Sequence, residues 1–145
     1  MRVDFYQLSR DPAEAVLPLI ARAVRAEGGR LLVVSADEGE LGRIGEALWE
    51  RFPEAFLANG RAGQAHAARQ PLLLSGECVA ENGARYIAFA DGVWREEADG
   101  FDRAFLLFGD AGLDGARACW RQLGMREEVE RRFWKQDGGK WREGP

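Results

Sequence analysis

Length, composition and charge limit what this protein can be. The chain has 145 residues, of which 46% are hydrophobic, and a formal net charge of −4 at pH 7. This is enough apolar material for one domain that spans residues 1–145. The weak negative charge argues against a protein that wraps duplex DNA by neutralising many phosphates.

The cysteines and the hydropathy pattern favour a reducing, cytoplasmic location. Cys78 and Cys119 lie far apart and neither belongs to a CxxC pair, so we expect neither a disulfide framework nor a zinc site. The N-terminal segment lacks the apolar core of a secretion signal, and no stretch approaches the ~18 apolar residues of a membrane span. We therefore expect a protein that is neither exported nor inserted in a membrane.

The chain opens with a strand pattern followed by a helix pattern. Residues 3–8 are rich in β-branched and aromatic side chains, which predicts a strand. We expect Asp11 to cap a helix that has Pro12 at its first position and ends near the glycines at 28–29. Pro18 falls inside this helix, which predicts a kink or an irregular first turn.

A second strand and helix follow at once. The continuous apolar run at 31–34 is typical of a strand buried on both faces of a parallel sheet. Asp37 then opens a helix with an apolar face that ends in Leu48 and Trp49. The alternation predicts a βαβ unit and hence an α/β protein with a Rossmann-like, open and mainly parallel sheet, covered by helices on both faces.

The rest of the chain predicts three more strands, about five in all, and a third helix. A long irregular surface loop is expected after Phe52 and Pro53, and a helix is expected from Leu113 through Trp120 toward Arg131. The strand patterns lie at residues 71–74, 85–89 and 101–108.

No motif predicts an enzyme or a bound cofactor. A dinucleotide site needs a glycine-rich turn after the first strand, but residues 9–12 contain no glycine, and no P-loop occurs. His66, the single histidine, lies in a predicted loop without a nucleophile pattern. We therefore expect no catalytic residue, no cofactor and no metal.

The region richest in potential binding residues is the basic and aromatic C-terminal part. Residues 1–114 carry 12 Lys and Arg against 19 Asp and Glu, a balance of −7, whereas residues 115–145 carry 8 against 5, a balance of +3. Arg117 and Arg121 share one face of the predicted helix, with Trp120 beside them. Such a group suits a short acidic peptide that ends in an aromatic residue and a carboxylate. The alternative is that Trp120 is a core residue and the arginines only keep the surface soluble.

The order of several short motifs resembles the chi subunit of the bacterial DNA polymerase III holoenzyme. The matching segments are 3–8 (VDFYQL), 47–49 (ALW), 56–60 (FLANG), 116–121 (ARACWR) and 133–141 (FWKQDGGKW). Two departures occur: Ala58 and Asn59 stand where the family often has Pro-His, and residues 125–132 are more charged than the usual turn.

The resemblance implies a non-catalytic accessory subunit in DNA replication. Chi-like proteins bind the acidic, phenylalanine-ending tail of single-stranded DNA-binding protein, and many also bind the psi subunit, which links them to the clamp-loader complex. DNA contact is then mainly indirect. By motif position, Arg117, Trp120 and Arg121 are carried over as tail-binding residues. Lys135 and Lys140 are added as candidates from charge alone.

Three points stay open from sequence alone. The surface for psi is only suggested, near the aromatic residues Trp49 and Phe52. A nucleotide-binding Rossmann-like enzyme is one rival function. The other rival is a direct binder of single-stranded DNA, in which the C-terminal aromatic residues stack on bases beside basic groups.

Overall fold

A computed structural model describes residues 1–144 of the chain. Its helices are α1 (Ala13–Ala26), α2 (Glu38–Glu50) and α3 (Leu113–Leu123). Its strands are β1 (Arg2–Gln7), β2 (Leu31–Val34), β3 (Asn59–Arg61), β4 (Leu72–Ser75), β5 (Tyr86–Phe89), β6 (Arg103–Phe108), β7 (Glu130–Asp137) and β8 (Lys140–Glu143).

All strands belong to one sheet with the order β3-β4-β2-β5-β6-β1-β7-β8. Every neighbouring pair is parallel except β7 and β8, which form an antiparallel hairpin. The predicted α/β class and mainly parallel sheet are therefore confirmed. The prediction of about five strands is wrong, because the sheet of residues 1–144 has eight: β3, β7 and β8 were missed.

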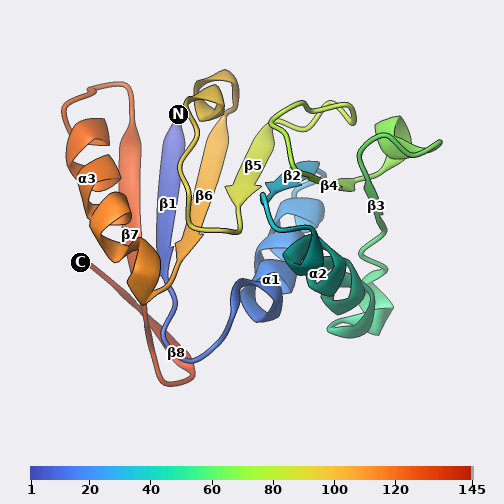
Figure 1. Ribbon diagram of the computed structural model, residues 1–145, viewed down its shortest axis with the longest axis horizontal. Helices are drawn as coiled ribbons and strands as arrows, with labels where there is room; N and C mark the ends of the chain where they lie inside the picture. Colours follow the sequence, from blue (N-terminus) through green and yellow to red (C-terminus); the bar gives the residue numbers. More distant parts are fainter. Residues whose placement is uncertain (145) are drawn as a thin grey trace.

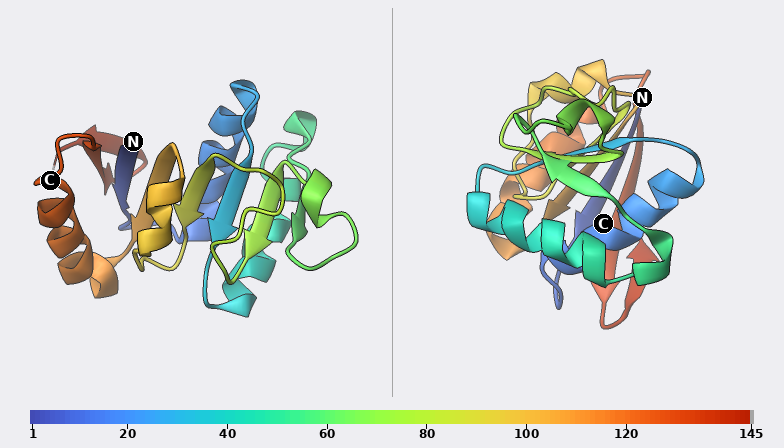
Figure 2. Two further views of the ribbon diagram at one scale, coloured as in Figure 1. Left: turned by 90° about the horizontal axis from the view of Figure 1, so that it is seen from above. Right: turned by 90° about the vertical axis from the view of Figure 1, so that its right-hand side faces the viewer.

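The helices lie on both faces of the sheet, as Figure 2 shows. One apolar core joins α1 and α2 to the sheet face that carries Val33, Leu74 and Leu107. The other core lies between α3 and the opposite face, which carries Val3 and Phe5 of β1. Because side chains alternate along a strand, β1 contributes to both layers.

The N-termini of α1 and α2 are capped differently. Asp37 caps α2 as predicted, since its Oδ1 accepts a hydrogen bond from the Glu40 N–H at 3.1 Å. The predicted Asp11 cap of α1 is wrong. Pro12 holds the N-cap position without a side-chain cap, and α1 continues through Pro18 as one helix. Asp11 instead accepts a hydrogen bond from Gln136 Nε2 at 2.8 Å.

The C-terminal segment is a hairpin instead of the end of a long helix. α3 stops at Leu123, far short of the predicted Arg131, and β7 then pairs in parallel with β1 along the whole length of β1. The turn between β7 and β8 consists of Gly138 and Gly139, and Gly138 has a φ of 62°. A Gly-Gly pair between strands is typical of tight hairpins, which need positive φ values. The first strand of the chain, β1, thus lies beside β7 from its C-terminal part (Figure 1).

Candidate functional site

The outward face of α3 carries two arginines without partners. Arg117 and Arg121 are both exposed, while Ala116, Cys119 and Leu123 on the other side of the helix are buried. Neither guanidinium forms an ion pair or hydrogen bond with any residue of 1–144, although most arginines around them are paired. The two positive charges are therefore free to meet an anionic ligand.

Trp120 lies beside these arginines and is half-buried. Its ring meets Phe5 at a centroid distance of 5.3 Å and Phe133 at 5.5 Å, both edge to face. This geometry is favourable for aromatic pairs and anchors α3 on β1 and β7. Trp120 is therefore part of the core under α3, and part of its indole still reaches the surface next to Arg117 and Arg121.

Sequence reasoning missed a third cation at this place, Arg131 of β7. Its Cζ lies 4.1 Å from the centroid of the Trp120 ring, and its Nη1 donates a 2.6 Å hydrogen bond to the Trp120 carbonyl. The helix pattern from Leu113 is expected to run toward Arg131, so this residue is not expected on a strand. The signal that could have found it is the strand alternation of β7, which puts Arg131 on the same face as buried Phe133.

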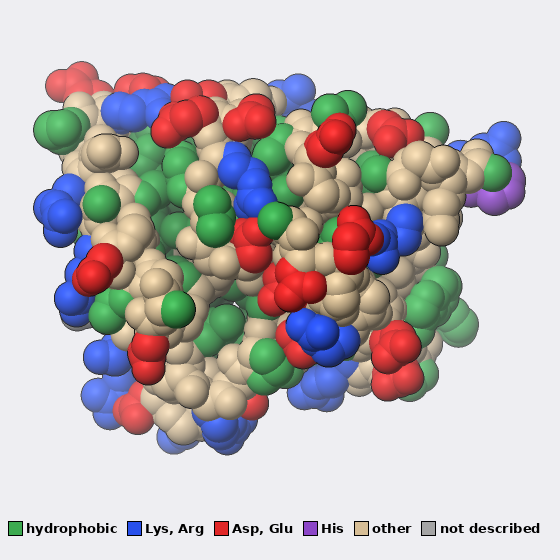
Figure 3. Space-filling view, in the orientation of Figure 1, with side chains coloured by type: hydrophobic (Ala, Val, Ile, Leu, Met, Phe, Trp, Pro, Cys, Tyr) green, Lys and Arg blue, Asp and Glu red, His purple; other side chains and the backbone are tan. Residues whose placement is uncertain are grey.

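The two lysines chosen from charge lie on the hairpin. Lys135 follows Phe133 by two residues, so it is on the α3 side of the sheet and roughly 7 Å further along the strand. Lys140 is the register partner of Asp137 at the hairpin tip, roughly 13 Å along β7 from Phe133. The structure therefore brings Lys135 closer to the α3 group than Lys140. Lys and Arg side chains line the edge of the molecule formed by α3 and this hairpin (Figure 3).

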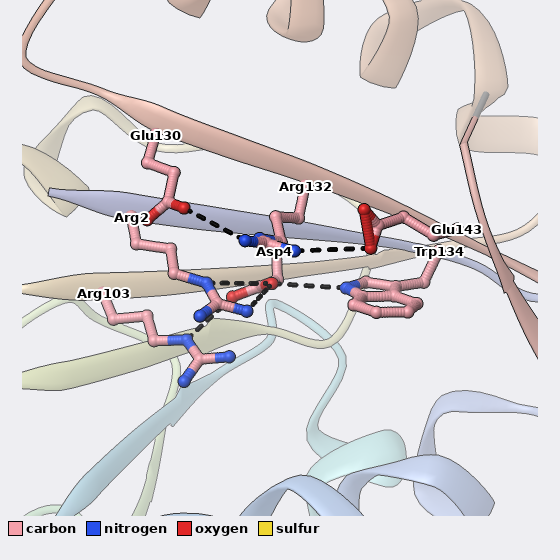
Figure 4. Close-up of polar contacts among 7 residues, drawn as sticks. All are labelled: Arg2, Asp4, Arg103, Glu130, Arg132, Trp134 and Glu143. Carbon is pink, nitrogen blue, oxygen red and sulfur yellow. Dashed lines mark hydrogen bonds and ion pairs between the residues drawn. The ribbon is translucent and has the colours of Figure 1, made fainter.

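The other face of β7 is held by a polar network around Asp4, which is fully buried (Figure 4). Its carboxylate accepts hydrogen bonds from Arg103 Nε at 2.7 Å, Arg2 Nη2 at 3.0 Å and Trp134 Nε1 at 3.3 Å. Three donors stabilise a charge that would otherwise be costly to bury. Burial, together with the charge of Asp4, also raises the pKa of neighbouring Tyr6 to about 12.

A buried amide fixes the end of β7 next to the end of β1. Gln136 Oε1 accepts hydrogen bonds from the backbone N–H groups of Ser9, Arg10 and Asp11 at 3.0, 3.0 and 3.3 Å. Because Gln136 and the Asp4 network lock β7 in register, they also fix where Arg131 and Lys135 stand.

The carboxyl ends of the central strands form a crevice that is acidic. In open α/β sheets this is the usual place for a nucleotide. Here the lining includes Asp11, Glu40, Asp91 and Asp110, and no Lys or Arg. Burial, with the charge of Asp91 nearby, raises the pKa of Glu40. Phosphate groups are therefore disfavoured at this crevice.

The single histidine, His66, and the cysteine Cys119 differ in burial. His66 is exposed, and burial raises the pKa of the Cys119 thiol to about 12, so this cysteine is a packing residue. Among residues 1–144, no group of three or more His, Cys, Asp and Glu is placed to hold a metal ion. None of the helices in this part of the chain is long and apolar enough to cross a membrane.

A second exposed surface lies where α2 ends. The side chain of Trp49 is 54% exposed and that of Phe56 is 80% exposed. Phe52, named from sequence, is buried beneath Arg22, whose Cζ lies 3.9 Å from its ring centroid. Phe56 follows a short 3₁₀ turn at Pro53–Ala55 and has a φ of 47°, which a non-glycine residue rarely adopts. The predicted irregular loop thus contains this turn and the short strand β3.

These observations define a class: a small α/β protein of one mainly parallel sheet, with unpaired cations along the helix at one end and exposed aromatic residues at the other. Comparison with protein families then identifies the group. The family described as "DNA polymerase III chi subunit, HolC" matches residues 1–129, and the chain belongs to this family. No curated protein sequence matches the chain. The family match ends just before β7, so Arg131, Lys135 and Lys140 lie outside it. Membership indicates an accessory role in DNA polymerase III and DNA replication.

Proposed function

We propose that the protein is a non-catalytic adaptor of DNA polymerase III that binds the acidic C-terminal tail of single-stranded DNA-binding protein through α3. The observation that carries this proposal is the pair of exposed, unpaired guanidinium groups of Arg117 and Arg121 beside the half-exposed indole of Trp120. Such a pair suits the carboxylates of an acidic peptide, and the indole offers apolar surface to a terminal phenylalanine.

Charge distribution supports a peptide over DNA as the direct ligand. Residues 1–114 carry a balance of −7, which repels phosphate chains, and the +3 balance is confined to the last 31 residues, 115–145. A short acidic peptide can stay on the cationic edge, whereas a long single strand also meets the acidic body.

The test is titration of the protein with a labelled peptide that copies the acidic tail and ends in phenylalanine. A matched peptide with an amidated C-terminus keeps the sequence but loses the terminal charge. The proposal expects saturable binding of the acid form and weaker binding of the amide. Tight, salt-sensitive binding of single-stranded oligonucleotides without peptide binding would favour the direct DNA-binding alternative instead.

We also propose that the other end of the molecule receives the psi subunit and so joins the clamp-loader complex. The exposed Trp49 and Phe56 support this, because large exposed aromatic residues are favoured at protein interfaces. Replacing Phe56 with Ser should remove psi binding without loss of tail-peptide binding. Loss of tail binding and retained psi binding would contradict the assignment.

A further inference from the structure

Arg131 contacts Trp120 in two ways at once. Its guanidinium lies over the indole, with Cζ 4.1 Å from the ring centroid, and its Nη1 donates a 2.6 Å hydrogen bond to the Trp120 carbonyl. That carbonyl also accepts the Gly124 N–H at 3.1 Å, so it is one of the last carbonyls of α3. A cation at this end of a helix is favourable because the helix dipole is negative there.

Gly124 is what allows this arrangement. A Cβ atom added at Gly124 would lie 2.5 Å from Arg131 Nη1 and 2.6 Å from Arg131 Cζ, which is closer than such atoms can approach. The backbone of Gly124 is ordinary, with φ of −65° and ψ of −17°, so any residue could adopt it. The side chain is therefore excluded by the Arg131 guanidinium and not by the backbone.

Like the two arginines of α3, Arg131 has no carboxylate partner within residues 1–144. Arg131 is half-buried, and its positively charged guanidinium lies over the Trp120 ring. The indole thus contacts this guanidinium as well as the rings of Phe5 and Phe133. Its orientation beside Arg117 and Arg121 is fixed before a ligand arrives.

We propose that Arg131 is the positioning residue of the peptide site on α3, and that Gly124 is required there to admit it. This inference rests on the proposed binding of an acidic peptide by α3. A preset indole loses little freedom on binding, which favours affinity. Lysine cannot replace Arg131, because its ammonium lacks the flat guanidinium that stacks on the ring while donating to the carbonyl.

Four variants test the proposal on the full chain. Arg131→Lys keeps the charge and removes the planar contact, and Gly124→Ala pushes the guanidinium away. Gly115→Ala is the matched control, because a Cβ on this helical glycine meets nothing within 4 Å. The fourth variant combines Gly124→Ala with Arg131→Ala, for comparison with Arg131→Ala alone.

Two measurements are made on each variant. One is the dissociation constant for the acidic peptide, and the other is the fluorine NMR spectrum of protein labelled with 5-fluorotryptophan. The Trp120 resonance is assigned by its absence in Trp120→Phe, and the remaining four tryptophans of the five serve as internal references. Thermal unfolding checks that every variant is folded.

The proposal predicts that Arg131→Lys and Gly124→Ala each weaken peptide binding by about tenfold. Both variants should shift the Trp120 resonance alone and leave the unfolding midpoint nearly unchanged. Gly115→Ala should bind as the parent does. In the Arg131→Ala background, Gly124→Ala should have no further effect on binding.

If the parent protein binds the peptide and Arg131→Lys binds it equally well, the inference is overturned. The proposed function would still stand in that case. An equal effect of Gly124→Ala in both backgrounds would also overturn the inference, because the effect would then not pass through Arg131. A parent that does not bind the peptide would remove the proposed function and the inference together.

Discussion

At the scale of single residues, the cations of this protein differ in whether they are paired. Arg2 and Arg103 neutralise the buried Asp4, and Arg95 forms a half-buried pair with Asp91 at 2.8 Å. Arg117 and Arg121 have no such partner in the described chain. An unpaired cation can bind an anion without first breaking an internal contact, and this is the physical basis for choosing α3 as the site.

Replacement of Arg121 tests this choice directly. Arg121→Ala should weaken tail-peptide binding by a factor of about 10 to 100, since a charge-assisted hydrogen bond is lost. Its unfolding free energy should change little, because exposed charges contribute little to stability. Arg69→Ala, at an exposed arginine of the distant 3₁₀ turn Ala67–Arg69, is the control and should bind normally. Equal binding by both variants would show that α3 is not the site.

The stability of the protein should depend on alkaline pH through the Tyr6 hydroxyl and the Cys119 thiol. Burial raises the pKa of Tyr6 and that of Cys119 to about 12 each, from ordinary values of 10.0 and 9.0. The unfolded chain therefore loses these protons first, so the unfolding free energy should fall as pH rises from about 9 to about 12. Chemical denaturation across this range measures the slope. Tyr6→Phe should make it shallower, and an unchanged slope would contradict the burial argument for Tyr6.

At the scale of elements, sequence reasoning succeeded where periodicity and burial agree. The apolar run at 31–34 became the buried strand β2, and the Asp37 cap with its apolar helix face became α2. It failed for β7, where charged residues on both sides of Phe133 resemble a solvated helix. The strand forms there because β1 offers a free edge and Gln136 satisfies three N–H groups beyond it.

The same distinction between local sequence patterns and contacts of distant segments applies to the candidate site. Arg117 and Arg121 could be placed from their four-residue spacing on a helix. Arg131 could not, because its contact with Trp120 depends on β7 pairing with β1, a contact between opposite ends of the chain.

Because the buried amide of Gln136 fixes β7, its removal should destabilise the protein. Gln136→Ala should lower the unfolding free energy by about 2–4 kcal/mol, because three backbone N–H groups lose their acceptor and the Asp11 carboxylate loses one of its donors. Urea denaturation measures this, and Lys135→Ala at the exposed neighbouring position is the control. A loss no greater than that of the control would mean that water replaces the amide and that Gln136 does not fix the strand.

At the scale of the whole molecule, the sheet separates the two exposed candidate surfaces. α3 packs over β1 and β7 near one end of the strand order, whereas α2 contacts β3 and β4 at the other. Figure 1 shows α2 and α3 over different ends of the sheet; α2 carries Trp49 and leads to Phe56, whereas α3 carries Arg117 and Arg121. This separation suits an adaptor that holds two partners at once without competition between them.

Recognition of the acidic tail of single-stranded DNA-binding protein by α3 can be tested on the intact partner protein. The affinity of this protein for full-length single-stranded DNA-binding protein is measured by calorimetry beside its affinity for the same protein without its last residues. Binding of the full-length partner should be saturable, and binding to the truncated one should be lost. Equal affinity for both would contradict recognition of the tail by α3.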